Sequence, residues 1–129
     1  MRAILDTHTW IWWANASTKL STHARQQIHR SQVLGVSAIS CLEVATLVEK
    51  NRLKLDRDVL IWIKQALSLP RIQFLPLTPE ICVRATQLGN DFHGDPADRI
   101  LVATTLEQGA ILITKDERIH TSQLVKAIW

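Results

Sequence analysis

The chain has 129 residues and a mass of 14.6 kDa, the usual size of one domain, so we expect a single domain over residues 1–129. Hydrophobic residues make up 47% and charged residues 21%, which excludes a disordered chain. The longest uncharged stretch, residues 7–18, is shorter than the ~20 apolar residues that a membrane span needs. The formal net charge is +3, which many soluble domains carry.

Cysteine usage and the start of the chain predict a cytoplasmic protein. Cys41 and Cys82 form no Cys-x-x-Cys pair, so we expect neither a disulfide framework nor a cysteine zinc site. Arg2 and Asp6 place charges where a secretory signal would have an apolar segment.

Apolar strands and amphipathic helices are predicted along the whole chain. In chain order they are strand 2–6, helix 7–15, helix 21–31, strand 33–36, helix 40–51, helix 56–67, strand 72–75, helix 78–89, helix 99–108, strand 110–114 and strand 124–128. The strands are short, apolar and β-branched, as parallel strands buried on both faces are. We therefore expect an α/β fold, with a central parallel sheet of four to five short strands and helices on both sides.

Two helix starts are marked by capping residues. Asp95 is placed as an N-cap, with Pro96 at the first helical position and Asp98 at the third, and Gly109 ends that helix. Ser40 and Glu43 have the spacing of a capping box for the helix that ends near residue 51.

Four acidic residues are expected at one edge of the sheet. Asp6 and Asp116 follow strands directly or within two residues, and Glu43 and Asp98 lie in the first turns of helices. Ligands of open parallel sheets bind beyond the carboxyl ends of the strands, where helix N-termini also lie. Asp98 differs from the other three acids in that no predicted strand directly precedes its helix. Alternatively, each acid is structural and serves only as a helix cap, a turn residue or a first-turn residue that stabilises a helix.

A cluster of these acids would need protons or cations. Two carboxylates about 4 Å apart repel each other by roughly 4 kcal/mol at an effective dielectric constant near 20. Oxygen ligands favour Mg²⁺ or Mn²⁺ over zinc. Such a site could hold one or two ions that activate water for phosphodiester cleavage.

The charge balance is consistent with a polyanionic substrate. When the four acids are set aside as ligands, 8 of the 12 Asp and Glu residues remain against 15 Lys and Arg residues. Arg99, Lys115 and Arg118 lie beside the acids in sequence, and each is either a phosphate contact or an ordinary solvated charge.

Four segments together resemble the PIN-domain family, and within it the VapC-type toxins of bacterial toxin–antitoxin modules. They are residues 5–8 (Leu-Asp-Thr-His), 40–44 (Ser-Cys-Leu-Glu-Val), 93–99 (His-Gly-Asp-Pro-Ala-Asp-Arg) and 113–116 (Ile-Thr-Lys-Asp). The resemblance covers essentially the whole chain. It implies an α/β/α sandwich and a Mg²⁺- or Mn²⁺-dependent endoribonuclease.

The resemblance also assigns roles to residues. Its acidic quartet corresponds to Asp6, Glu43, Asp98 and Asp116, with Asp6 and Asp98 as direct ligands and the other two acting directly or through water. Asp95, Arg99 and Thr114 are accessory candidates. Thr114 either hydrogen-bonds a carboxylate or water, or only ends the strand. His8 and His93 lie near the acids, and each either positions substrate or makes a turn hydrogen bond.

The family further implies a small antitoxin as partner and either a homodimer or a toxin–antitoxin hetero-oligomer. Trp10, Trp12 and Trp13 lie on one predicted helix at about 100° per residue, so they cannot all face one core. Either at least one lies at an interface, or two are core and one is half-exposed. Trp62 and Trp129 are expected in the core or in dimer contacts.

Three other functions remain open from the sequence. A PIN-domain ribonuclease of RNA processing or decay would use the same chemistry without an antitoxin. A phosphoacceptor signalling domain would need paired acids after the first strand and an Asp after a middle strand, whereas strand 72–75 ends in Leu-Pro. The intact acidic set argues against a non-catalytic binding module.

Overall fold

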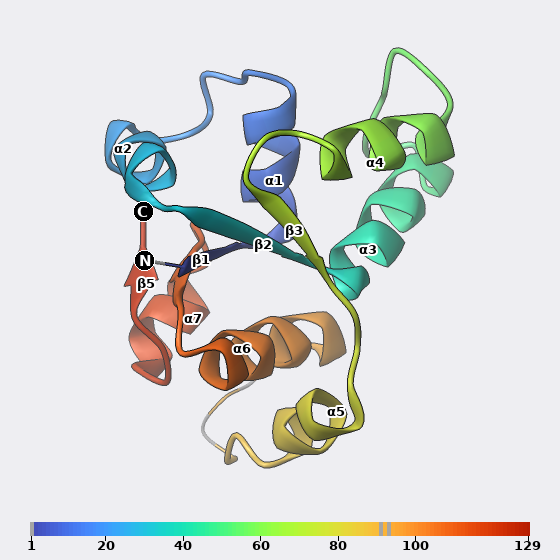
Figure 1. Cartoon of the computed structure of the whole chain (residues 1–129). Coiled ribbons are helices and arrows are strands. Elements are labelled where there is room, and N and C mark those ends of the chain that lie inside the picture. The colour runs from blue at the N-terminus through green and yellow to red at the C-terminus, as the bar shows by residue number, and fades with distance from the viewer. Residues whose placement is uncertain (1, 91, 93) are drawn as a thin grey trace.

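A five-stranded parallel sheet forms the centre of the computed structural model, which describes residues 2–90, 92 and 94–129 (Figure 1). The strand order is β3-β2-β1-β4-β5, and helices cover both faces. The elements are β1 (Arg2–Leu5), α1 (Thr7–Ala14), α2 (Thr22–Arg30), β2 (Val33–Ser37), α3 (Ala38–Glu49), α4 (Val59–Leu67), β3 (Ile72–Leu75), α5 (Pro79–Thr86), α6 (Pro96–Gln108), β4 (Ile111–Ile113), α7 (Glu117–Ser122) and β5 (Ala127–Ile128). The expected α/β fold class is confirmed.

Side chains of the central strand β1 point alternately to the two faces of the sheet, and each face has its own hydrophobic core. Ala3 and Leu5 pack with the buried side chains of α1 to α4, whereas Ile4 packs with those of α6 and α7. Figure 1 shows this division, with α1 to α4 on one side of the sheet and α5 to α7 on the other. Because both faces are buried, β1 after Arg2 and the whole of β4 are apolar, whereas Gln73 and Phe74 of the edge strand β3 are exposed.

The chain reverses its direction of winding at β1. Strands β2 and β3 extend the sheet on one side of β1, and β4 and β5 extend it on the other. Such a switch point leaves a crevice beyond the carboxyl ends of the two strands that flank it, which here are β1 and β4. Asp6 and Asp116 follow these two strands.

The predicted capping box of Ser40 and Glu43 is wrong. Helix α3 begins one turn earlier, directly after β2, and Ser37 caps it by accepting a hydrogen bond from the Ile39 amide at 3.1 Å. Ser40 is therefore fully buried inside the helix. Both Ser37 and Ser40 can act as an N-cap by residue type. The spacing from Ser40 to Glu43 matched a capping box and led to the choice of Ser40.

Other boundaries differ by a few residues. Helix α4 begins at Val59 rather than residue 56, because Asp58 is its N-cap. Strand β5 is confined to Ala127–Ile128, and helix α7 was not predicted. Within the described ranges, no helix has the length and apolar character to cross a bilayer.

Candidate active site

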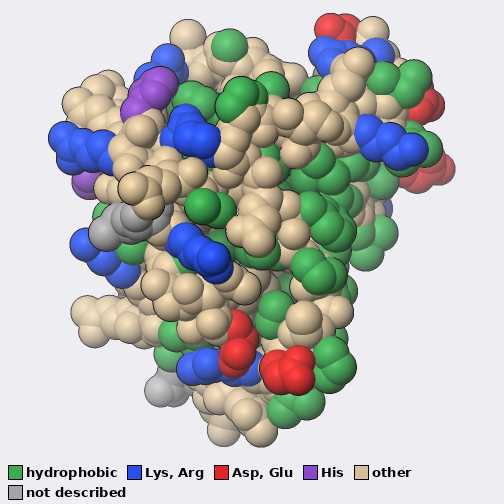
Figure 2. Space-filling model, viewed as in Figure 1, with side chains coloured by type: hydrophobic (Ala, Val, Ile, Leu, Met, Phe, Trp, Pro, Cys, Tyr) green, Lys and Arg blue, Asp and Glu red, His purple; other side chains and the backbone are tan. Residues whose placement is uncertain are grey.

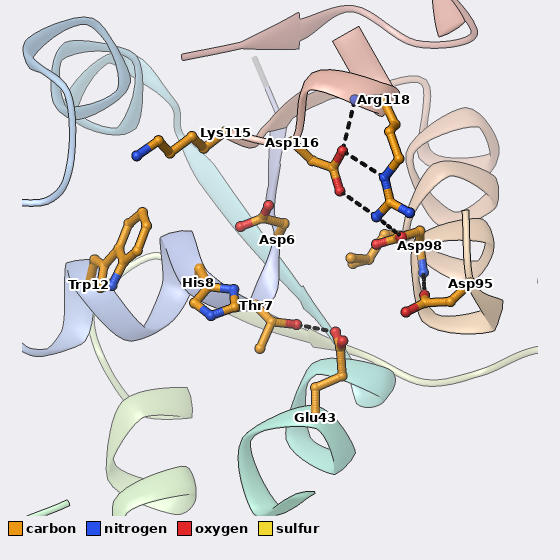
Figure 3. A pocket seen from close by; sticks show the side chains of 11 residues that line it. Asp6, Thr7, His8, Trp12, Glu43, Asp95, Asp98, Lys115, Asp116 and Arg118 are labelled. Carbon is orange, nitrogen blue, oxygen red and sulfur yellow. Dashed lines mark hydrogen bonds and ion pairs between the residues drawn. The ribbon is translucent and has the colours of Figure 1, made fainter. Parts of the chain in front are cut away.

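The four predicted acids line one pocket at the carboxyl edge of the sheet. The pocket has a volume of about 530 Å³. Its lining residues are Asp6, Thr7, His8, Trp12, Glu43, Asp95, Asp98, Leu101, Lys115, Asp116 and Arg118. Figure 3 shows Asp6 in the middle, with Asp98, Asp116 and Arg118 on one side and His8, Trp12 and Lys115 on the other. Residues from the β1–α1 junction, α1, α3, α6, the β4–α7 connection and α7 thus meet in one place.

Asp6 joins the two central strands at this edge. One carboxylate oxygen caps helix α1 by accepting a hydrogen bond from the Thr9 amide at 2.8 Å. The other accepts a hydrogen bond from the Thr114 hydroxyl at the end of β4. Thr114 is fully buried, and its hydroxyl also accepts a hydrogen bond from the Asp116 amide at 3.0 Å. Thr114 therefore does more than end the strand, since it fixes the orientation of Asp6.

Glu43 projects into the pocket from helix α3. Its carboxylate accepts a hydrogen bond from the buried Thr7 hydroxyl, which also lies 2.9 Å from the Ser40 hydroxyl. Burial raises the pKa of Glu43, and the charges of Asp95 and Asp6 add to that effect, whereas the Thr7 hydrogen bond opposes it. Thr7 is a site residue that was not predicted from the sequence. Its place directly after Asp6, at the start of a helix, was the available signal.

Asp98 lies in the first turn of helix α6, as predicted. Asp95 caps this helix by accepting a hydrogen bond from the Asp98 amide at 2.9 Å, Pro96 occupies the first turn, and Gly109 ends the helix in the left-handed region at φ 58°. Burial, followed by the charges of Asp95 and Asp116, raises the pKa of Asp98 to about 6. The positive charge of Arg118 opposes this rise but does not outweigh it.

Asp116 is the N-cap of helix α7 and is paired with an arginine. It accepts a hydrogen bond from the Arg118 amide at 2.8 Å, and the Arg118 guanidinium lies 3.0 Å from its second oxygen. The same guanidinium lies 2.8 Å from a carboxylate oxygen of Asp98. Burial acts to raise the pKa of Asp116, but the hydrogen bonds and charge of Arg118 outweigh it and lower that pKa.

The four acids do not converge on one point as their side chains stand. No three His, Cys, Asp or Glu side chains come close enough to hold a metal ion within residues 2–90, 92 and 94–129. Thr114 holds Asp6, Thr7 holds Glu43, and Arg118 holds Asp98 and Asp116. The guanidinium of Arg118 reaches Asp116 through two nitrogens and Asp98 through one. The donor set consists of carboxylate oxygens, which fits a hard divalent cation.

Arg99 does not line the pocket. Its guanidinium donates to the backbone carbonyls of Phe92 at 2.6 Å and Ala85 at 3.3 Å, and it lies over the Phe92 ring. Arg99 thus ties the segment before α6 to α5, which helps to place Asp95. His93 lies outside the described residues, and His8 lines the pocket as an exposed side chain.

Replacing Asp95 by Ala is expected to lower the free energy of unfolding by about 1 kcal/mol, because the Asp98 amide loses its capping partner. Urea denaturation would measure this change. The matched control is Asp58→Ala, which removes the exposed cap of α4 far from the pocket. If Asp95→Ala removes activity while stability is unchanged, Asp95 acts in the site and its capping role is minor.

Comparisons with known proteins agree with the fold and identify the family. The PIN domain family matches residues 3–122. Ribonuclease VapC22 of Mycobacterium tuberculosis is 38% identical over 118 residues, which cover 92% of this chain and 89% of that protein.

Two crystal structures share the fold at 14% identity. VapBC2 from Rickettsia felis, bound to a DNA fragment from its promoter, has a TM-score of 0.73 and covers 98% of this chain and 97% of that one. DNA-bound VapBC from Salmonella typhimurium has a TM-score of 0.72 with coverages of 98% and 96%. The chain therefore belongs to the PIN-domain family and is a VapC-type member of it.

Proposed function

We propose that this protein is a Mg²⁺- or Mn²⁺-dependent endoribonuclease that acts as the toxin of a VapBC-type toxin–antitoxin module. The observation that carries the proposal is the pocket itself, where four carboxylates from separate elements meet in a chain of the PIN-domain family. The name of the relative Ribonuclease VapC22 supports RNA as the substrate. We propose further that residues 1–129 act as one PIN domain in the cytoplasm.

The proposed roles follow from the surroundings of each acid. Asp6 and Asp98 are the direct ligands, and Glu43 and Asp116 act directly or through water. A divalent cation bound there would supply an activated water and would stabilise the negative charge that develops during phosphodiester cleavage. Thr114 orients Asp6 through its hydroxyl, and Thr7 does the same for Glu43. Asp95 and Arg99 support the site by holding the start of α6 in place.

Basic side chains near the pocket suit a polyanion. Lys115 lines the pocket and extends toward Trp12 in Figure 3, away from Asp98 and Asp116. If the four acids hold cations, 15 basic residues face 8 other acids, so the remaining surface is strongly positive. We propose that Lys115 contacts an RNA phosphate.

An apolar surface supports the proposed antitoxin partner. Large hydrophobic side chains that are 42% to 61% exposed lie on α3, on α4, on β3 and just after β3. They are Leu42, Leu60, Ile61, Phe74 and Leu77. Figure 2 shows hydrophobic side chains gathered on the side of the molecule where α3 and α4 lie. Exposed apolar patches of this kind mark protein interfaces. We propose that the antitoxin, or a second copy of the chain, covers this surface.

Cleavage of purified total RNA tests the proposed activity. Incubation with Mg²⁺ or Mn²⁺ is expected to give discrete products, and EDTA is expected to abolish them. The ends of the products would identify the target. A well-folded protein that binds the metal and leaves total RNA intact would contradict a general ribonuclease activity. Failure to bind either metal would contradict the proposed mechanism as well.

A further inference from the structure

The guanidinium of Arg118 occupies the acidic side of the pocket. It lies 2.8 Å from Asp98 and 3.0 Å from Asp116, and so it bridges two of the four proposed ligands (Figure 3). These two ion pairs join α6 to the segment after β4, and the two carboxylates belong to residues 18 positions apart. A single positive charge therefore holds together two acids that would otherwise repel each other.

We propose that Arg118 is an internal counterion of the metal-free site, which a divalent cation must displace in order to bind. This inference rests on the proposed function, because it assumes that Asp98 and Asp116 receive a metal. It goes further by assigning to Arg118 the control of metal affinity.

The environment of Arg118 allows such an exchange. Its side chain is 57% exposed, whereas the side chains of Asp98 and Asp116 are 16% and 24% exposed. The guanidinium can thus turn into solvent without leaving a hole in the core, while the two carboxylates stay in the pocket. Both of its ion pairs within the described part of the chain are made to these two acids. A divalent cation on the same oxygens repels the guanidinium, so the two cannot share the site.

The present separation of the acids is consistent with this exchange. No group of three potential ligands converges among the residues that the structure describes, and Arg118 engages two of the four acids. Release of Arg118 frees Asp98 and Asp116 to turn toward Asp6. A site that needs this rearrangement binds metal more weakly than one that is already assembled, since part of the binding free energy breaks the two ion pairs.

Isothermal titration of Mg²⁺ and Mn²⁺ into the metal-free protein tests the proposal. Arg118→Gln is expected to tighten metal binding by about threefold to thirtyfold, the range that corresponds to two partly exposed ion pairs. Arg118→Lys keeps the charge, so its affinity is expected to lie between those of Arg118→Gln and the unchanged protein. The matched control is Arg84→Gln, which removes one charge and one ion pair, to Glu107, away from the pocket. This control is expected to leave metal affinity unchanged.

Thermal unfolding gives a second readout that does not depend on catalysis. Without metal, Arg118→Gln is expected to melt at a lower temperature than the unchanged protein, because the clustered acids lose their counterion. Saturating Mg²⁺ is expected to produce a larger rise in Tm in Arg118→Gln than in the unchanged protein.

Two outcomes would overturn the inference. Equal or weaker metal binding by Arg118→Gln, with normal binding by the unchanged protein, would mean that Arg118 is a helix or substrate residue or assists the metal. That result would leave the proposed nuclease intact. Absence of metal binding by the unchanged protein would remove both the exchange and the proposed metal mechanism.

Discussion

Replacing Asp98 by Asn is expected to reduce metal-dependent RNA cleavage by roughly a thousandfold while the protein stays folded. An amide is a neutral and weaker ligand than a carboxylate, so a cation loses charge compensation at the place where Asp98 projects into the pocket. The cleavage rate on a defined RNA at saturating Mg²⁺ measures the effect. Arg84→Gln serves again as the distant control that keeps normal activity.

The same substitution is expected to stabilise the metal-free protein at neutral pH. The pKa of Asp98 is raised to about 6 in the folded state from an ordinary value of 3.8. Its ionisation therefore opposes folding above about pH 6, and this penalty fades as the pH falls through 6 toward 4. After solvent screening and the lost ion pair to Arg118 are discounted, we expect Asp98→Asn to gain about 1 kcal/mol near pH 7.5 in EDTA. The gain should vanish near pH 4.

Urea denaturation of both proteins at several pH values tests this expectation. A large loss of stability in Asp98→Asn at every pH would mean that the carboxylate serves mainly to stabilise the first turn of α6. In that case its loss of activity would reflect damage to the fold.

Replacing Trp10 by Ala is expected to lower the free energy of unfolding by about 3–5 kcal/mol. Trp10 is fully buried on α1, its ring meets Trp62 of α4 edge-on at 5.2 Å, and its indole N–H donates to the Ala66 carbonyl at 3.4 Å. This cost is a large share of the roughly 5–15 kcal/mol by which domains are stable. Guanidinium denaturation followed by circular dichroism would measure it.

Trp12→Ala on the same helix is the matched control. Trp12 is only half-buried, against Trp129 and His8, so its loss is expected to cost about 1–2 kcal/mol. Equal losses for the two variants would mean that Trp10 and Trp62 do not anchor α1 as the structure implies. In the structure Trp10 is core and Trp12 and Trp13 are half-buried, so the alternative with two core tryptophans on α1 is wrong. Trp62 is core as well.

Local chemistry made helix α6 predictable. Asp favours the N-cap of a helix, Pro its first turn and Gly its end, and each preference depends only on neighbouring residues. Asp95, Pro96 and Gly109 all occupy the predicted positions. The start of α3 was not predictable in this way, because the helix follows β2 without a loop. The spacing of serine and glutamate does not show how closely a helix follows a strand. Helix α7 has six residues, too few for a periodic pattern to be visible, although Asp116 caps it as its residue type allows.

The meeting of the acids was predictable only in outline. Asp6 and Asp116 follow neighbouring strands, so the rule for parallel sheets places them at one edge. Asp98 follows no strand directly, and its place in the pocket depends on how α6 crosses from α5 back to β4. The ion pairs of Arg118 and the hydrogen bond from Thr7 to Glu43 depend on side-chain orientation, which the sequence does not show.

The position of β4 beside β1 has a consequence for the protein during its own synthesis. Ala3 and Leu5 pair with Ile111 and Ile113, so the two central strands come from opposite ends of the chain. A growing polypeptide carries Asp6 and Glu43 long before Asp98 and Asp116 exist, and the sheet cannot gain β4 until more than 110 residues have been made. Under the proposed function, nuclease activity cannot arise on a ribosome-bound fragment. A cell that makes such an enzyme is therefore exposed to it only after Asp116 has been made, and an inhibitor already present can capture the protein as it folds.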